Sequence, residues 1–222
     1  MDLSHSLPTL NISPLKNIGL AKLNLKLKDD FTDMVLSQSV DWNLSKFAHR
    51  EYNEQRGYKA DPSNIESQVK SGELDSRVVV RQLRSGLKQE FYLGDWGNIQ
   101  DKRNKVTEYL CDEILKDNAK YFNKTFMLKF TSEQGLLPHK DGGGTSRLYI
   151  PISPFGEDYS RLEFYHDNQI YYVYNDIVPI PVYLFSSRVI HAVFNQGYPE
   201  RINLQINSSL SYKETLALFN ED

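Results

Sequence analysis

Four residues in the C-terminal half of the chain carry side chains suited to metal chemistry: His139, Asp141, His191 and Arg201. Two imidazoles and a carboxylate in the order His-x-Asp…His are the ligand set of a mononuclear non-haem iron(II) site. Three protein ligands leave the other coordination positions open for a co-substrate and O2. Arg201 follows the second histidine by ten residues, and its planar guanidinium matches a carboxylate through paired hydrogen bonds. The quartet predicts an iron centre beside a dicarboxylate site.

The spacing of the three ligands fits a β-sheet protein. His139 and Asp141 are two residues apart, so in an extended segment their side chains point to the same face and can reach one metal. The third ligand must come from another strand, and His191 lies in a predicted strand over 189–194. The separation of 50 positions from Asp141 to His191 allows several strands to cross and return.

Two further strands show an alternation that places polar groups beside this metal. In the last predicted strand, the polar residues on one face are Arg201, Asn203, Gln205 and Asn207, and the aliphatic residues on the other are Ile202, Leu204 and Ile206. The predicted strand over 146–152 sets Arg147 and Tyr149 against Leu148, Ile150 and Ile152. Both arginines are expected to converge on the cavity that holds the metal. A buried guanidinium needs a partner, and the distal carboxylate of 2-oxoglutarate supplies one while its 2-oxoacid end chelates iron.

The elements that must position these residues are short strands. From residue 125 onward we predict strands over 125–131, 146–152, 161–166, 169–174, 181–185, 189–194 and 201–207, with a hairpin turn at His166-Asp-Asn168. Many short, closely spaced strands are typical of an antiparallel sandwich such as the jelly roll. We expect a mainly β protein with flanking helices and a double-stranded β-helix (jelly-roll, cupin-like) core.

The first half of the chain gives weaker signals. Alternating leucines at 23, 25 and 27 predict a short strand, and Asp29 and Asp30 before Phe31 predict a short helix. We expect surface loops over 43–75, a strand over 78–83 and a helix over about 100–117 in which Cys111 is a core residue rather than a reactive thiol. The expected layout is one domain, 1–222, with a helix-containing part to about 120 and the jelly-roll core over about 121–212.

The composition limits the class of protein. Hydrophobic residues make up 40% of the 222 residues, which is enough for a packed core. The 26 basic residues nearly balance the 29 acidic ones, so no nucleic-acid partner is expected. A single cysteine excludes an internal disulfide. No signal peptide and no apolar run of about 18 residues is evident, so we expect a cytoplasmic protein without a membrane partner. The oligomeric state is not predicted.

The two stretches around the metal residues resemble a known family. Residues 139–152 (HKDGGGTSRLYIPI) and 191–204 (HAVFNQGYPERINL) are similar to the two motifs of the aspartyl/asparaginyl β-hydroxylases. These are iron(II)/2-oxoglutarate oxygenases, and related members hydroxylate free proline. The resemblance covers about residues 125–210 and implies the jelly-roll fold.

The resemblance also implies roles for individual residues. His139, Asp141 and His191 would be the iron ligands, Arg201 would bind the distal carboxylate of 2-oxoglutarate, and Arg147 would assist the co-substrate. The family has histidine where this chain has Tyr149, so a co-substrate contact and an ordinary core tyrosine are both open there. Related halogenases replace the carboxylate ligand, so the retained aspartate favours hydroxylation.

The expected function is therefore an iron(II)/2-oxoglutarate-dependent dioxygenase that hydroxylates an unactivated C–H bond and releases succinate and CO2. By family analogy, its substrate is a small molecule, an amino acid or an amino-acid-containing metabolite. One alternative is a protein- or lipid-modifying hydroxylase of the same superfamily. Another is a cupin-like metal-binding protein that is not an oxygenase. Arg201 discriminates against the latter, which has no need of a dicarboxylate clamp.

Overall fold

The computed structural model describes residues 12–46, 88, 90–132, 134–141, 146–153, 161–166, 169–173, 180–195 and 200–219. Its strands are β1 (Leu20–Leu23), β2 (Trp42–Lys46), β3 (Glu90–Asn98), β4 (Phe122–Phe130), β5 (Gly135–His139), β6 (Ser146–Ser153), β7 (Arg161–His166), β8 (Gln169–Val173), β9 (Val182–Ser186), β10 (Ile190–Phe194) and β11 (Arg201–Ser208). The α-helices are α1 (Phe31–Leu36), α5 (Lys105–Tyr109) and α6 (Tyr212–Ala217). The 3-10 turns are η1 (Ser13–Asn17), η2 (Ile99–Asp101) and η4 (Lys116–Tyr121), and η3 (Leu110–Leu115) is a π-helix.

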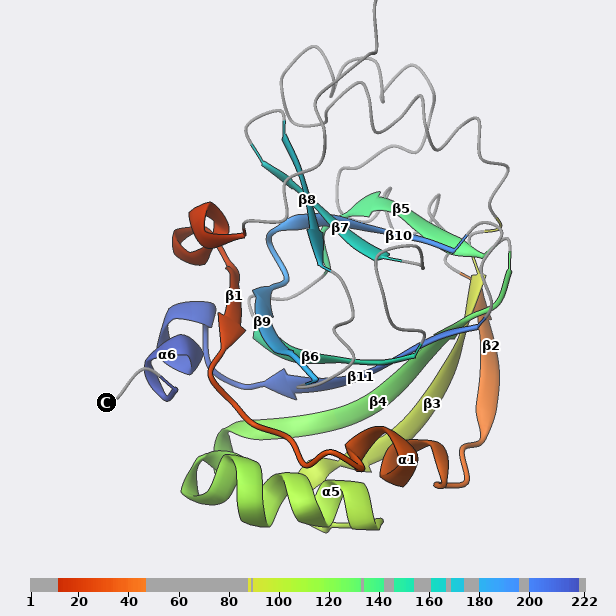
Figure 1. The fold of residues 1–222 in the computed structure, drawn as a ribbon, viewed down its shortest axis with the longest axis vertical. Coiled ribbons are helices and arrows are strands. Elements are labelled where there is room, and N and C mark those ends of the chain that lie inside the picture. The colour runs from red at the N-terminus through yellow and green to blue at the C-terminus, as the bar shows by residue number, and fades with distance from the viewer. Residues whose placement is uncertain are drawn as a thin grey trace, which may run out of the picture.

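The strands form two antiparallel sheets that face each other (Figure 1). One has the order β1-β9-β6-β11-β4-β3-β2 and the other the order β5-β10-β7-β8. From β4 onward the chain passes back and forth between the sheets: β4, β6, β9 and β11 belong to the larger one, and β5, β7, β8 and β10 to the smaller one. This winding is the double-stranded β-helix, so the predicted jelly-roll class is confirmed.

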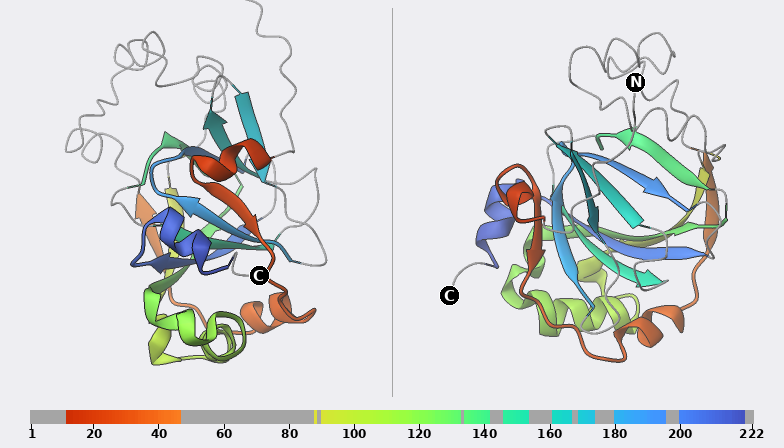
Figure 2. Two further views of the ribbon diagram at one scale, coloured as in Figure 1. Left: turned by 90° about the vertical axis from the view of Figure 1, so that its left-hand side faces the viewer. Right: turned by 45° about the horizontal axis from the view of Figure 1, so that its top comes forward.

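Side-chain alternation divides the apolar residues between two cores. Aliphatic residues of the central strands, such as Leu148, Ile150 and Leu204, point to the outer face of the larger sheet and pack with residues of α1 and α5. Figure 2 shows both helices beneath that sheet. The second core lies between the sheets and is rich in aromatic rings, among them Phe130, Tyr149, Phe164 and Phe185. The predicted site residues Arg147, His191 and Arg201 lie in the same layer as the second core.

Three strands from the N-terminal half complete the larger sheet, and here two predictions were wrong. The strand expected along Leu23, Leu25 and Leu27 is β1, which ends at Leu23 because its partner β9 begins at Val182, opposite that residue. Without a neighbour to pair with, residues 24–28 continue outside the ladder. The loop expected from residue 43 begins instead as β2, which pairs with β3. The predicted strand over 78–83 lies outside the described residues.

The helical region is confirmed, but it is not one helix. Lys102, with a φ of 48°, ends η2 in the left-handed region. Asn104 then starts α5 with a capping box, its side chain accepting from the backbone of Thr107. Cys111 is buried in η3, where its Sγ donates to the carbonyl of Ile99 and burial raises the pKa of the thiol. A core role for this cysteine is confirmed.

The later strands lie within a residue or a few of their predicted bounds, and the helix at Phe31 is confirmed. His166 and Gln169 are opposite each other in the β7–β8 hairpin, as the predicted turn requires. Among the described residues, no helix is both long and apolar enough to cross a lipid bilayer.

The outer core should carry most of the fold's stability. Leu204 is fully buried in β11, whereas Leu44 in the edge strand β2 is 50% exposed. We expect Leu204→Ala to lower the free energy of unfolding by about 2–5 kcal/mol through lost burial and a cavity. Leu44→Ala should change it by less than about 0.5 kcal/mol. Urea denaturation measures both, and equal losses would contradict this assignment of the core.

Candidate metal and co-substrate site

His191 occupies the middle of the smaller sheet. Strand β10 lies between β5 and β7, and the Cα of His191 is opposite His139 on one side and Phe164 on the other. Its ring packs against Phe164 and Phe185, with centroids 5.9 and 5.3 Å away. Nδ1 lies 3.0 Å from the carbonyl oxygen of Val189. An N–H at Nδ1 donating to that carbonyl leaves Nε2 as the ring's lone-pair atom, the form in which histidine binds metals.

Asp141 brings a carboxylate to the same point. It follows the end of β5 by two residues, and its Oδ2 lies 3.6 Å from Nε2 of His191. One cation can contact both atoms at that separation. The backbone of β5 places His139 beside this pair, whereas the side chain of His139 is not among those described. Accordingly, the described side chains contain no complete group of three ligands. The glycines at 142–144 also lie outside the described residues.

Arg147 on β6 is held beside the metal residues. Its Nη1 lies 3.0 Å from Oδ2 of Asp141 and donates to Oε1 of Gln205 at 3.1 Å. The guanidinium also lies against the rings of Phe126 and Phe185, 5.8 and 5.5 Å from their centroids. The expected convergence of Arg147 on the cavity is confirmed, with the carboxylate of Asp141 as its partner. Its predicted contact with the co-substrate stays a prediction.

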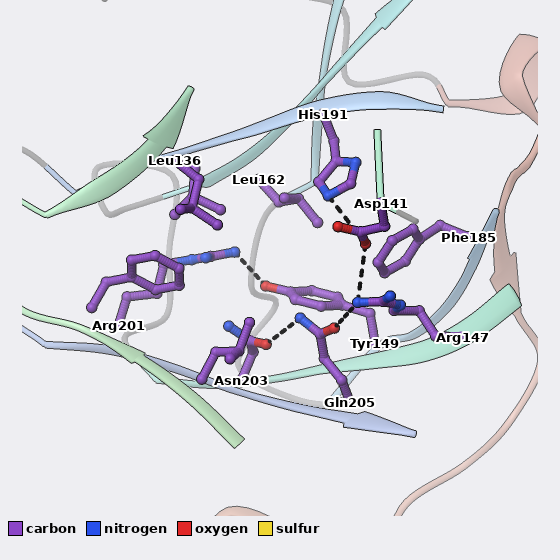
Figure 3. A pocket seen from close by; sticks show the side chains of 13 residues that line it. Leu136, Asp141, Arg147, Tyr149, Leu162, Phe185, His191, Arg201, Asn203 and Gln205 are labelled. Atoms are coloured by element: carbon purple, nitrogen blue, oxygen red, sulfur yellow. Dashed lines mark hydrogen bonds and ion pairs between the residues drawn. The ribbon is translucent and has the colours of Figure 1, made fainter. Parts of the chain in front are cut away.

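Arg201 is buried at the other end of the same cavity (Figure 3). Its Nη2 donates to the phenolic oxygen of Tyr149, and its guanidinium packs over the ring of Phe130. No described residue accepts from Nε or Nη1. Burial lowers the pKa of Arg201, an effect that the contact with Tyr149 opposes. Burial likewise raises the pKa of Tyr149, so its hydroxyl keeps a proton to donate.

The cavity between these groups has one polar and one apolar side. The alternation predicted for β6 and β11 is confirmed: Arg147, Tyr149, Arg201, Asn203 and Gln205 line it, and the aliphatic residues between them belong to the outer core. The apolar lining comes from both sheets and consists of Leu128, Phe130, Leu136, Leu162, Phe185 and Val193. Sequence reasoning placed Asn203 and Gln205 on the right face without assigning them to the site. Their position in a polar row beside Arg201 was the available signal.

These residues fit the predicted groups. A carboxylate oxygen and an imidazole nitrogen face each other at one end, which is a donor set for iron(II). At the other end, a buried guanidinium beside a phenol has donors that no described residue accepts from, which is a donor set for a carboxylate. Thirteen residues line the single space between the two ends.

The fold is similar to that of a known prolyl hydroxylase. A prolyl hydroxylase from Trichoplax adhaerens, solved with a peptide fragment of the oxygen degradation domain of hypoxia inducible factor, superposes with a TM-score of 0.56 at 15% identity, covering 96% of this chain and 92% of that one. A Pseudomonas putida prolyl-4-hydroxylase gives 0.43 at 14% identity (80% and 96% covered). An oxidoreductase of the 2OG-Fe(II) oxygenase family from Burkholderia pseudomallei gives 0.40 at 12% identity (67% and 91% covered).

No family model and no curated protein matches the sequence. The comparison with the Trichoplax enzyme therefore establishes the architecture and assigns no residue. The comparison confirms the jelly-roll architecture, and the expected iron(II)/2-oxoglutarate oxygenase activity stays a prediction.

The unmatched guanidinium should cost stability. Replacing a buried ion pair by apolar side chains is often neutral or stabilising by about 1–4 kcal/mol, and Arg201 has no carboxylate partner among the described residues. We expect Arg201→Met to raise the free energy of unfolding by about that amount when no dicarboxylate is added. Arg147→Met is the matched control and should lower it, because it removes the partner of Asp141. Urea denaturation of both variants decides the point, and a destabilised Arg201→Met would show that the charge is already satisfied.

Proposed function

We propose that this protein is an iron(II)- and 2-oxoglutarate-dependent hydroxylase. The observation that carries the proposal is the position of Arg201 in the same cavity as Asp141 and His191. Its guanidinium is 1% exposed, and two of its donor atoms meet no acceptor among the described residues. A binding protein for metal alone has no use for a buried cation facing its metal ligands. A dianionic co-substrate that bridges the two ends does require one.

In this proposal each end of the cavity holds one part of the cofactor system. His139, Asp141 and His191 hold the iron, and Arg201 with Tyr149 holds the distal carboxylate of 2-oxoglutarate. When bound, iron and 2-oxoglutarate supply O2 activation coupled to oxidative decarboxylation, with release of succinate and CO2 and hydroxylation of a C–H bond. Tyr149 accepts from Arg201, so its own O–H remains available as a further donor to that carboxylate.

The remaining cavity residues orient the proposed metal ligands and exclude water from the site. Val189 holds the ring of His191 through Nδ1, and Arg147 holds the carboxylate of Asp141. The leucine, valine and phenylalanine side chains on the apolar side exclude water, which strengthens each charged hydrogen bond inside.

The substrate class is the finer part of the proposal. The motifs at 139–152 and 191–204 resemble a family that includes hydroxylases of a free amino acid, which supports a small substrate such as an amino acid or an amino-acid-containing metabolite. The Trichoplax enzyme was solved with a peptide. A panel for succinate formation should therefore contain amino acids, small metabolites and proline-containing peptides, with mass spectrometry for the gain of one oxygen.

The carboxylate clamp can be tested on Arg201. A hydrogen bond to a charged group contributes about 1.5–3 kcal/mol, so Arg201→Met should weaken 2-oxoglutarate binding by about tenfold or more while iron still binds. Arg188→Met makes the same change at an exposed position and should have no effect. Anaerobic titration of the visible band of the iron–2-oxoglutarate chelate measures the affinity. No band in the wild-type protein, or an unchanged affinity in Arg201→Met, would refute the assignment.

The metal site can be tested on Asp141. Removing one of three protein ligands should weaken Mn(II) binding by at least about tenfold, because each ligand contributes to affinity, and should abolish succinate formation. Asp117→Ala, at an exposed carboxylate, is the control. Electron paramagnetic resonance of free Mn(II) gives the affinity. Full metal binding in Asp141→Ala would mean that another residue supplies the ligand.

A further inference from the structure

A chain of polar contacts crosses the floor of the cavity from the metal end to the co-substrate end. It runs from Asp141 to Arg147, from Arg147 to Gln205 at 3.1 Å, and from Gln205 to Asn203 at 2.9 Å. Figure 3 shows these contacts as an unbroken series of dashed lines. Its last member, Asn203, is only 1% exposed.

The hydrogen bond between Arg147 and Gln205 fixes the orientation of both amide groups in the series. A guanidinium has donors and no acceptor, so the atom of Gln205 that faces Arg147 must be its oxygen, Oε1. The amide nitrogen Nε2 then points the other way and donates to Oδ1 of Asn203. Asn203 is thereby left with its amide nitrogen as the outward atom. The direction of both amides, which is usually ambiguous, is determined here by Arg147.

The outward nitrogen of Asn203 is a buried donor that no described residue accepts from. Such groups are rare in native proteins and call for a partner. Asn203 is two residues from Arg201 on the same face of β11, a separation of about 7 Å along a strand, and both side chains line the cavity. In Figure 3 the amide oxygen is turned toward Gln205 and the nitrogen toward the Arg201 side.

We propose that Asn203 is a further co-substrate-binding residue, whose amide nitrogen donates to the distal carboxylate of 2-oxoglutarate alongside Arg201 and Tyr149. Gln205 is a positioning residue that aims this donor, and Arg147 is the group that sets the direction of the relay. The inference rests on the proposed function, since it assigns a third donor to the same carboxylate. If Asn203 has this role, the preference for a ligand with a distal carboxylate depends partly on an uncharged side chain.

The test compares two ligands that differ only in the distal group: 2-oxoglutarate and 2-oxopentanoate, which has a methyl group in place of the distal carboxylate. Dissociation constants are measured by isothermal titration calorimetry on the Mn(II)-loaded full chain. Asn203→Leu keeps much of the side-chain shape and removes the donor. Asn207→Leu is the matched control, because Asn207 lies on the same face of the same strand but outside the cavity lining.

Asn203→Leu should weaken 2-oxoglutarate binding by about tenfold or more, the loss of one hydrogen bond to a charged group, and change 2-oxopentanoate binding by less than about twofold. Asn207→Leu should leave both constants unchanged. An unchanged affinity for 2-oxoglutarate in Asn203→Leu, or an equal loss for both ligands, would overturn the inference.

A second variant tests the relay without touching Asn203. In Gln205→Glu the new carboxylate still pairs with Arg147 but can no longer donate to Asn203. The amide of Asn203 must then invert, donating to Glu and turning its oxygen toward the ligand carboxylate. We expect weaker 2-oxoglutarate binding, again with little change for 2-oxopentanoate. Equal affinity for 2-oxoglutarate in this variant and the wild type would exclude the directional relay.

The outcomes separate this inference from the proposed function. If the wild type does not prefer 2-oxoglutarate over 2-oxopentanoate, both fail. If the wild type shows the preference and Arg201→Met loses it, while the variants at 203 and 205 keep it, only the role of Asn203 is refuted. Thermal unfolding of each variant confirms that the compared proteins are folded.

Discussion

Strand β11 runs through the middle of the larger sheet with both faces buried, and this constraint governs the site. Neighbouring strands β4 and β6 satisfy its backbone groups on both edges. Its aliphatic residues fill the core between the larger sheet and the helices α1 and α5, so its polar residues must face the space between the two sheets. A register shift of one residue would exchange the two sets and put Arg201 into an aliphatic core. The packing of Leu204 and Ile206 against the helices therefore fixes the position of the guanidinium.

The polar groups inside the cavity are unequally satisfied, and the difference has chemical meaning. Arg147 has a carboxylate and an amide as partners, whereas Arg201 has only a phenol among the described residues. Low polarizability around a buried charge makes every missing partner costly. A buried charge that lacks a partner lowers the free energy of unfolding of the empty protein. A dicarboxylate that supplies the partner gains this interaction energy when it binds, which raises its affinity. The same reasoning applies to the uncharged donor of Asn203.

Arg147 links the two ends of the cavity through a continuous series of polar contacts. Its donors meet the carboxylate of Asp141 on one side and the amide oxygen of Gln205 on the other. Each amide group has one donor end and one acceptor end. Arg147 fixes which end of Gln205 faces it, and Gln205 in turn fixes which end of Asn203 faces the cavity. The arginine that resembles a co-substrate residue in sequence thus contacts Asp141 directly. In our proposal it thereby positions a metal ligand, and it acts on the co-substrate through two intermediate amides.

The sequence by itself determined the polar and aliphatic faces of β6 and β11 and the jelly-roll class, and it predicted the metal residues. These follow from local rules, since side chains alternate along any strand and ligand types follow from metal chemistry. It misplaced β1, because the end of β1 depends on where its partner β9 begins. It missed β2, β3 and β5, and in β3 the glycines and polar residues of Glu90–Asn98 hide the alternation. Only the tertiary structure decided that Arg147 pairs with Asp141, that Tyr149 meets Arg201, and that Gln205 joins Arg147 to Asn203. Those contacts join residues on different strands or depend on which end of an amide faces a cation, and neither property is encoded in spacing along the chain.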